Sequence, residues 1–131
     1  RCGPLKMKYE YTENILTIGD KSIEFDNLIK EVIDFGDCFV VRTDNNKFIT
    51  NENVYGVNIN GQLNWQIKKM EKLTFNGKEY NGITDPYSGL TKVDNNRVIL
   101  YNWDSTNFEV NPKSGELLTD PMKSRIGHKP W

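Results

Sequence analysis

Alanine is missing from this chain of 131 residues, whereas asparagine occurs 16 times. Alanine is the residue that most favours an α-helix, and asparagine favours turns because its short side chain bonds to the nearby backbone. Asn-Gly, a dipeptide typical of tight hairpin turns, occurs at residues 60–61, 76–77 and 81–82. The composition therefore predicts an all-β protein.

Histidine and cysteine are almost absent, since the chain has only His128, Cys2 and Cys38. A zinc site needs three or four imidazole or thiolate ligands, and a Ser-His-Asp or Cys-His site would have to use His128, which lies in a polar tail. No glycine-rich phosphate loop is present in the sequence. We therefore expect no metal, no cofactor and no enzymatic activity.

The two cysteines have different surroundings. Cys38 lies in the apolar run CFVV, which predicts a buried thiol, although two cysteines could also form one disulfide. Cys2 precedes Met7, where MKYEYTENILTIGD has the character of a natural start, so we expect residues 1–6 to be a non-native or disordered leader. A lipid-modified Cys2 is the alternative, but the sequence lacks the apolar segment that should precede it.

Charge of one sign and long apolar runs are also scarce. Seventeen basic residues oppose 18 acidic residues, so the formal net charge is −1. This balance lacks the clustered basic surface of a nucleic-acid-binding domain. No apolar run approaches the ~18 residues of a membrane span, and no signal peptide is visible. We expect a cytoplasmic protein that binds neither nucleic acid nor membranes.

Short alternating segments between turns predict one domain over residues 7–118. The expected strands are three within 7–25, a pair at 29–35 and 38–42, a hairpin at 54–67, and strands at 90–93, 97–103 and 107–110. Residues 68–82 fit either one short helical turn or a long hairpin. Residues 119–131 predict an extended tail, because Pro121 and Pro130 argue against a regular element.

The segment VYGVNINGQLNW shows the hairpin pattern most clearly. Asn60-Gly61 predicts a two-residue type I′ turn, because both residues accept positive φ angles. Alternation along the second arm then places Leu63, Trp65 and Ile67 on one face. We therefore expect Trp65 to lie in the core.

A weak internal repeat relates the two halves of the chain. CFVVRTD…NVYGVNINGQLNW aligns with RVILYNW…NFEVNPKSGELL, so that Gly61 matches Gly115 and Leu63 matches Leu117. Residues 14–25 fit a third, shortened copy. A propeller blade takes roughly 40–50 residues and a closed ring at least about four blades. The predicted fold is therefore an antiparallel hairpin meander, either half-propeller-like or a small open twisted sandwich.

Aromatic and acidic residues in the second half are the candidate binding residues. Ile99, Tyr101 and Trp103 share one face of their strand, which is either packed in the core or exposed as a binding surface. The loops at 84–89 and 103–106 combine an aromatic residue with an acid, which suits a positively charged protein partner. The candidate contact residues are Asp85, Tyr87, Trp103 and Asp104.

Carboxylates offer the other chemical possibility. Two acids can flank a sugar as general acid and base, and the second half contains Asp85, Asp94, Asp104, Glu109 and Asp120. Aspartate also makes turns, and Asp94 and Asp104 lie where turns are predicted. We therefore favour binding over hydrolysis.

The segments NVYGVNINGQLNWQI, YNGI, RVILYNW and NFEVNPKSGEL resemble motifs of a group of small bacterial proteins. Several of these resemble immunity proteins, which protect a cell by binding a secreted or contact-delivered toxin. The hairpins resemble quinoprotein-type propeller repeats more distantly, where a tryptophan closes each blade. The resemblance covers residues 29–118.

The resemblance implies an immunity protein that neutralises a cognate toxin, such as a nuclease, by direct binding and occlusion. It implies no catalytic residue and no cofactor, and it indicates no oligomeric state. The alternative is a non-catalytic hairpin-repeat module that binds or assembles with another protein.

Overall fold

The computed structural model describes residues 8–44, 52–67, 70–75, 78–83, 86–103, 106–119 and 122–123. These residues contain strands and turns but no helix, and every strand pairing among them is antiparallel. The strands are β1 (Tyr9–Thr12), β2 (Ile15–Ile18), β3 (Lys21–Glu24), β4 (Ile29–Asp34), β5 (Cys38–Thr43), β6 (Val54–Asn58), β7 (Leu63–Gln66), β8 (Met70–Phe75), β9 (Lys78–Ile83), β10 (Tyr87–Asp94), β11 (Arg97–Asn102), β12 (Thr106–Val110) and β13 (Met122–Lys123). The predicted all-β meander is confirmed.

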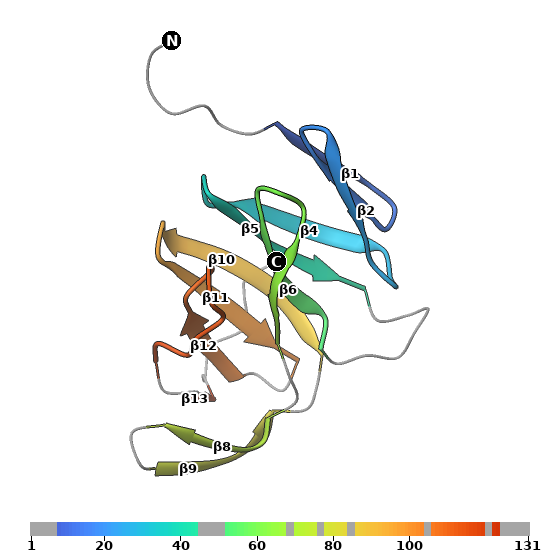
Figure 1. The fold of residues 1–131 in the computed structure, drawn as a ribbon. Coiled ribbons are helices and arrows are strands. Elements are labelled where there is room, and N and C mark those ends of the chain that lie inside the picture. The colour runs from blue at the N-terminus through green and yellow to red at the C-terminus, as the bar shows by residue number, and fades with distance from the viewer. Residues whose placement is uncertain are drawn as a thin grey trace.

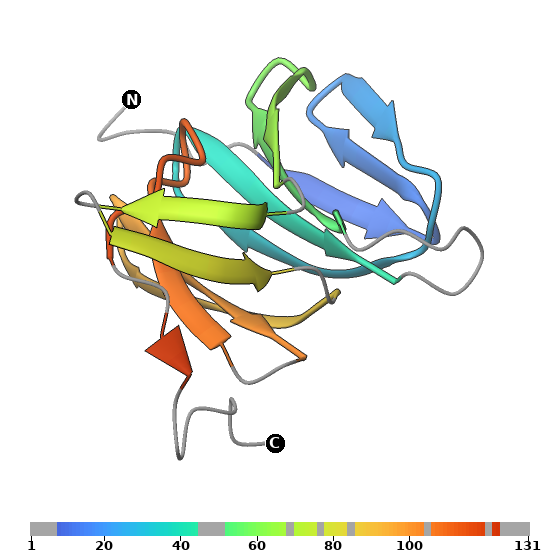
Figure 2. The same ribbon diagram turned by 90° about the horizontal axis from the view of Figure 1, so that it is seen from below.

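The strands form four sheets, and each sheet follows chain order. We call β1-β2-β3 the N-terminal sheet, β4-β5-β6-β7 the central sheet and β10-β11-β12-β13 the C-terminal sheet, and β8-β9 is a separate hairpin. The three larger sheets stack in that order, with β8-β9 at the far end of the molecule (Figures 1 and 2). Among the described strands the stack is open, as a part of a propeller would be.

Strands β5 and β6 of the central sheet are buried on both faces because they carry apolar residues at successive positions. Phe39 and Val41 pack with Leu16 and Ile18 of the N-terminal sheet. On the other face, Cys38 and Val40 pack with the C-terminal sheet. The residues of that sheet in the shared core are Tyr87, Leu90, Val98, Leu100, Phe108 and Val110. A continuous apolar run such as CFVV is what a strand between two layers requires.

The turn at Asn60-Gly61 differs from the predicted type I′ turn. Only Gly61 has a positive φ, +76°, whereas a type I′ turn needs positive φ at both residues. The Asn58 carbonyl accepts a hydrogen bond from the Gly61 N–H at 3.0 Å, and the Asn58 side chain accepts hydrogen bonds from the N–H groups of Asn60 and Gln62. The side chain of Asn58 therefore stabilises a loop that is longer than the predicted two-residue turn.

The register of β7 also differs from strict alternation. Val57 lies opposite Leu63, but its neighbour Gly56 lies opposite Trp65, so Asn64 is an extra residue in a β-bulge. Leu63 consequently faces the side of the N-terminal sheet and is 47% exposed. Trp65 and Ile67 face the C-terminal sheet. The prediction that all three share one face is wrong for Leu63.

Trp65 joins the central sheet to the C-terminal sheet. Its half-buried indole packs against the core, as predicted, and lies between Gly56 and Gly115. A Cβ atom on Gly115 would lie 2.7 Å from Trp65 Cδ2, and one on Gly56 would overlap the indole. The indole N–H donates a hydrogen bond to the Pro112 carbonyl at 2.8 Å. Glycine at both positions is what lets the ring approach two backbones.

The turns aligned by the internal repeat are similar, although the second is one residue longer. Asn111 accepts a backbone hydrogen bond from Gly115, four residues on, whereas Asn58 accepts one from Gly61, three residues on. Each asparagine side chain also accepts a hydrogen bond from the N–H group two residues on. Gly115 has a φ of +75°, close to that of Gly61. Leu117 lies opposite Val110 as Leu63 lies opposite Val57. The two turns are therefore built in the same way at the positions that the predicted repeat aligns.

The tail differs from its prediction at one point, because Met122–Lys123 forms β13 and pairs with β12. Pro121 directly precedes this strand, and proline is compatible with the start of an edge strand. Residues 1–6, including Cys2, lie outside the described residues, as do most residues of the tail. The hairpin alternative for residues 68–82 is confirmed by β8 and β9.

Candidate functional site

A polar cleft of about 310 Å³ opens where one end of the central sheet meets the C-terminal sheet. Trp103 stands at this cleft, directly after β11, and its side chain is 65% exposed. Its backbone N–H donates a hydrogen bond to the Pro86 carbonyl at 3.1 Å, which fixes the chain at this position. The remaining lining residues are Lys30, Arg42, Thr43, Asp44, Asn53, Tyr87 and Ser88.

Asn53 ties the two sheets together beneath the cleft, and only 1% of its surface is exposed. Its side-chain amide donates hydrogen bonds to the carbonyls of Thr43 at 2.8 Å and Tyr87 at 3.0 Å. Its side-chain oxygen accepts a hydrogen bond from the Tyr87 N–H at 2.9 Å. The amide thus completes the backbone hydrogen bonding of β10 at Tyr87, and the base of the cleft is rigid.

The charged side chains at the cleft are already balanced. Arg42 donates a 2.7 Å hydrogen bond to Glu31, and Lys30 lies 4.0 Å from Asp44. The lining includes hydroxyls but no histidine or cysteine, and the Ser88 hydroxyl donates to the Tyr101 carbonyl at 3.3 Å. Such a lining offers hydrogen bonds and paired charges to a ligand, but no activated nucleophile.

The structure describes two of the four predicted contact residues, and these two differ in exposure. Trp103 is exposed. Tyr87 is 2% exposed and packs edge-to-face against Phe108 at 6.1 Å, so its ring belongs to the core and is unavailable to a partner. Asp85 and Asp104 lie outside the described residues. The structure therefore places Trp103, but not Tyr87, at the surface.

The two faces of strand β11 differ in burial. Val98 and Leu100 are fully buried against the central sheet. Ile99 and Tyr101, on the opposite face, are half-buried, and exposure rises to that of Trp103 at the end of the strand. The exposed aromatic surface is thus concentrated at one end of the sheet.

The carboxylates of the second half that the structure describes have structural partners. Asp94 caps its turn by accepting a hydrogen bond from the Asn96 N–H at 2.8 Å, and it pairs with Arg97 at 2.9 Å. These hydrogen bonds lower the pKa of Asp94. Arg97 also lies 3.5 Å from Glu109. Asp94 and Glu109 therefore share one arginine and stabilise the β10–β11 turn.

Cys38 is a free and buried thiol, as predicted. Burial, reinforced by the nearby Asp37 carboxylate, raises its pKa to about 11. A thiol held so strongly in the protonated form is unreactive at neutral pH. Within the described ranges, no group of three or more His, Cys, Asp or Glu side chains is arranged to hold a metal ion.

The sequence pattern alone does not identify most of the residues that line the cleft. Lys30 lies near the start of β4, Arg42 lies near the end of β5, and Asn53 directly precedes β6. No motif distinguishes them from other polar residues at such positions. Asn53 directly before an apolar strand is the strongest indication, because a buried asparagine must find hydrogen-bond partners. Its partner Tyr87 is 34 residues away, which sequence alone does not reveal.

Comparison with known proteins gives a family but no relative. No curated protein and no solved structure matches the chain. Among the described residues, no helix is long and apolar enough to cross a membrane. A family described as "Domain of unknown function (DUF7957)" matches residues 6–122, which span both copies of the repeat and the N-terminal sheet. The chain belongs to this DUF7957 family.

Proposed function

We propose that this protein acts by binding another protein and that it is an immunity protein, which neutralises a bacterial toxin by occlusion. The observation that carries the proposal is Trp103, an aromatic side chain that is 65% exposed beside a rigid polar cleft. A tryptophan at the edge of such a cleft is the kind of residue that anchors protein interfaces.

The surroundings of Trp103 support binding to a protein surface. The Lys30–Asp44 and Arg42–Glu31 pairs lie at or beside the cleft and present both signs of charge. Paired charges around an aromatic anchor form the polar rim of a typical interface. The base is held by three hydrogen bonds of the Asn53 side chain, so little ordering is needed on binding.

The test is to search the adjacent genes for one that encodes a toxin and to measure affinity for its product, made as an inactive variant. We expect a stable complex in isothermal titration calorimetry, and co-expression of this protein should restore growth to cells that make the active toxin. Trp103→Ala should weaken binding by about 30-fold or more, as the loss of an interface anchor does.

The matched control is Tyr11→Ala, which removes an aromatic side chain that is 41% exposed on the N-terminal sheet. Both variants should keep the unfolding temperature of the parent protein, because both side chains are exposed. Absence of a complex, or equal binding by the parent protein and Trp103→Ala, would contradict the proposal.

A second candidate function is assembly with further copies of the chain. It is favoured by β1, an edge strand of the N-terminal sheet in which all four residues are exposed. An open edge of this kind can pair with a strand of another chain. Sedimentation equilibrium decides: a monomer at all concentrations excludes assembly through β1, whereas a dimer abolished by Tyr11→Pro establishes it.

A further inference from the structure

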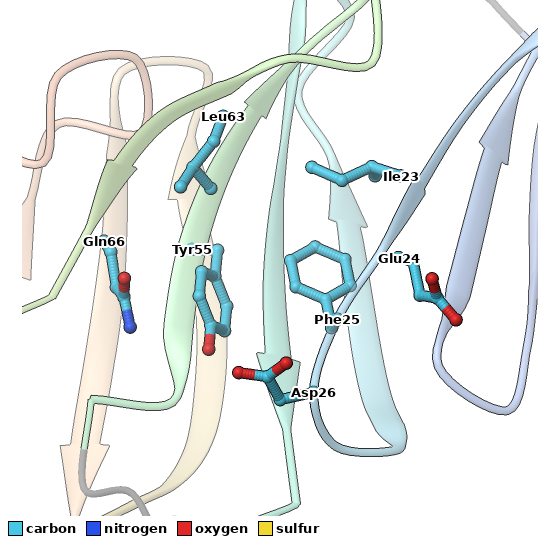
Figure 3. A pocket seen from close by; sticks show the side chains of 7 residues that line it. All are labelled: Ile23, Glu24, Phe25, Asp26, Tyr55, Leu63 and Gln66. Atoms are coloured by element: carbon cyan, nitrogen blue, oxygen red, sulfur yellow. The ribbon is translucent and has the colours of Figure 1, made fainter.

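A second hollow, which we call the groove, lies between the N-terminal sheet and β6-β7 of the central sheet. It exists because the N-terminal sheet has three strands and the central sheet has four, so that part of the central face stays uncovered. Its volume is about 170 Å³. Ile23, Glu24, Phe25, Asp26, Tyr55, Leu63 and Gln66 line it (Figure 3).

The groove is closed at one end and open at the other. The hairpin turn at Gly61 approaches β3 closely, since a Cβ atom on Gly61 would lie 3.1 Å from Lys21 Cβ. Leu63 and Ile23 lie toward one end of the groove, and Asp26 and Gln66 lie toward the other (Figure 3). A strand of a partner cannot run along the whole of β3, but a single side chain can enter.

The floor of the groove is formed by the exposed edges of two core rings, Phe25 and Tyr55, and its one well-exposed apolar wall is Leu63. The rings of Phe25 and Tyr55 contact each other with centroids 4.8 Å apart and planes tilted by 52°. Leu63 lines the groove while 47% of its surface remains exposed. An exposed leucine beside two aromatic rings is a surface that favours contact with the apolar stem of another side chain.

The open end carries negative charge. The Asp26 side chain points toward the Tyr55 hydroxyl (Figure 3), whereas Glu24 points away from the groove. No basic side chain of the described residues pairs with Asp26, although the structure contains ion pairs elsewhere. Burial, reinforced by the carboxylates of Asp26 and Glu52, raises the pKa of Tyr55.

These features specify one kind of occupant. Ligand pockets for small molecules usually exceed about 300 Å³, so the groove is too small for a cofactor and suits one side chain. An aromatic floor, one exposed apolar wall and a polar rim that includes the Asp26 carboxylate match a long side chain that ends in a cation. A guanidinium fits best, because it binds a carboxylate through two N–H groups.

We propose that the groove binds a single arginine side chain of a partner protein. Leu63 and the exposed edges of Phe25 and Tyr55 contact its aliphatic stem, and Asp26 binds its guanidinium. The inference rests on the proposed function only for the identity of the protein that carries the arginine, because the groove is separate from Trp103.

The experiment titrates the full chain with the tripeptide acetyl-Gly-Arg-Gly-amide and follows backbone amides by NMR. We expect saturable shifts at Phe25, Asp26, Tyr55 and Gln66 at probe concentrations up to roughly 10 mM. The same peptide with citrulline, which keeps the shape but lacks the charge, should bind at least tenfold more weakly. The lysine peptide should bind more weakly than the arginine peptide.

Two variants separate the groove from general attraction to acidic residues. Asp26→Asn should weaken binding about tenfold, whereas Asp20→Asn, which removes an exposed acid in the β2–β3 turn, should leave it unchanged. Leu63→Ala should also weaken binding, because it removes one wall. Absence of saturable shifts at the groove, equal binding of the citrulline peptide, or equal effects of Asp26→Asn and Asp20→Asn would each overturn the proposal.

The outcome of the peptide titration and the outcome of the toxin experiment are independent of each other. Failure of the peptide titration leaves the Trp103 surface as the sole proposed contact, and failure of the toxin experiment leaves an arginine-binding groove that serves another partner.

Discussion

Removal of the Trp65 indole tests how the sheets are joined. Trp65→Ala would empty the space between Gly56 and Gly115 and would remove the 2.8 Å hydrogen bond to Pro112. Deletion of a large aromatic side chain from a core costs about 3–5 kcal/mol. Trp65 is half-buried, so we expect the lower end of that range, about 3 kcal/mol. For a domain of this size, that loss lowers the melting temperature by roughly 10–15 °C.

The measurement is urea unfolding followed by far-ultraviolet circular dichroism, because the substitution itself changes tryptophan fluorescence. Linear extrapolation gives the free energy of unfolding in water. Trp65→Phe keeps an aromatic ring but loses the N–H donor, so it should cost only about 1–2 kcal/mol. The order parent, Trp65→Phe, Trp65→Ala is the expected ranking.

The matched control is Trp103→Ala, which removes the same side chain from a position that is 65% exposed. An exposed substitution away from caps and pairs usually changes stability by less than about 0.5 kcal/mol. If Trp65→Ala destabilised the protein no more than Trp103→Ala, the indole would not join the two sheets and the reasoning would be refuted.

Three further predictions concern the same interfaces. Asn53→Ala leaves backbone groups of Tyr87 and Thr43 without their side-chain partner. It should lower the free energy of unfolding, measured in urea, by about 3 kcal/mol or more. The exposed control Asn64→Ala should lower it by less than about 0.5 kcal/mol. Gly56→Ala should destabilise the parent protein far more than it destabilises the Trp65→Ala variant, because the added Cβ atom overlaps the indole. The control is Gly36→Ala, whose Cβ atom meets nothing within 4 Å. It should cost only about 1–2 kcal/mol of backbone strain, both in the parent protein and in the Trp65→Ala variant. Burial raises the pKa of the Cys38 thiol to about 11 from 9.0, so the folded state holds the thiol proton more tightly than the unfolded state does. Stability should therefore be full below pH 9 and fall by up to about 3 kcal/mol as pH rises to 11. Cys38→Ala should remove that part of the slope, and an unchanged slope would contradict the prediction.

The positions of the strands and turns were predictable because they depend on interactions between residues that are close in sequence. The absence of alanine, the turn-forming asparagines and the alternation of apolar residues placed the predicted strands close to their observed positions. The repeat was also predictable, since Asn58 and Asn111 use the same side-chain hydrogen bonds to shape equivalent turns. Both features act within a few residues of chain.

The orientation of individual side chains was less predictable. Alternation assumes no extra residue, and the bulge at Asn64 turns Leu63 to the opposite face from Trp65. Tyr87 follows Asp-Pro and has the character of a loop residue, yet it begins β10 because the Asn53 amide binds its backbone. That contact joins residues far apart in sequence, so a reading of local pattern places Tyr87 at the surface. The cleft and the groove arise in the same way, from residues of different sheets.

The two proposed contact surfaces open at the same end of the central sheet. The Gln66 side chain, which lines the groove, donates a hydrogen bond to the Glu52 carbonyl at 3.0 Å, and the next residue, Asn53, lines the cleft. A stable interface covers about 800 Å² on each partner, which is more than either hollow offers. A single partner that covered both hollows would contact Trp103 and place an arginine near Asp26.

This arrangement predicts how two substitutions combine. Trp103 and Asp26 share no contact, so their effects on the affinity for one protein partner should add on a free-energy scale to within about 0.5 kcal/mol. Calorimetry of Trp103→Ala, Asp26→Asn and the double variant measures this directly. Full loss in Trp103→Ala combined with no loss in Asp26→Asn would show that the partner contacts the cleft alone. Additive losses in both would place a single partner across the end of the central sheet, with the rigid Asn53 hydrogen bonds between its two points of attachment.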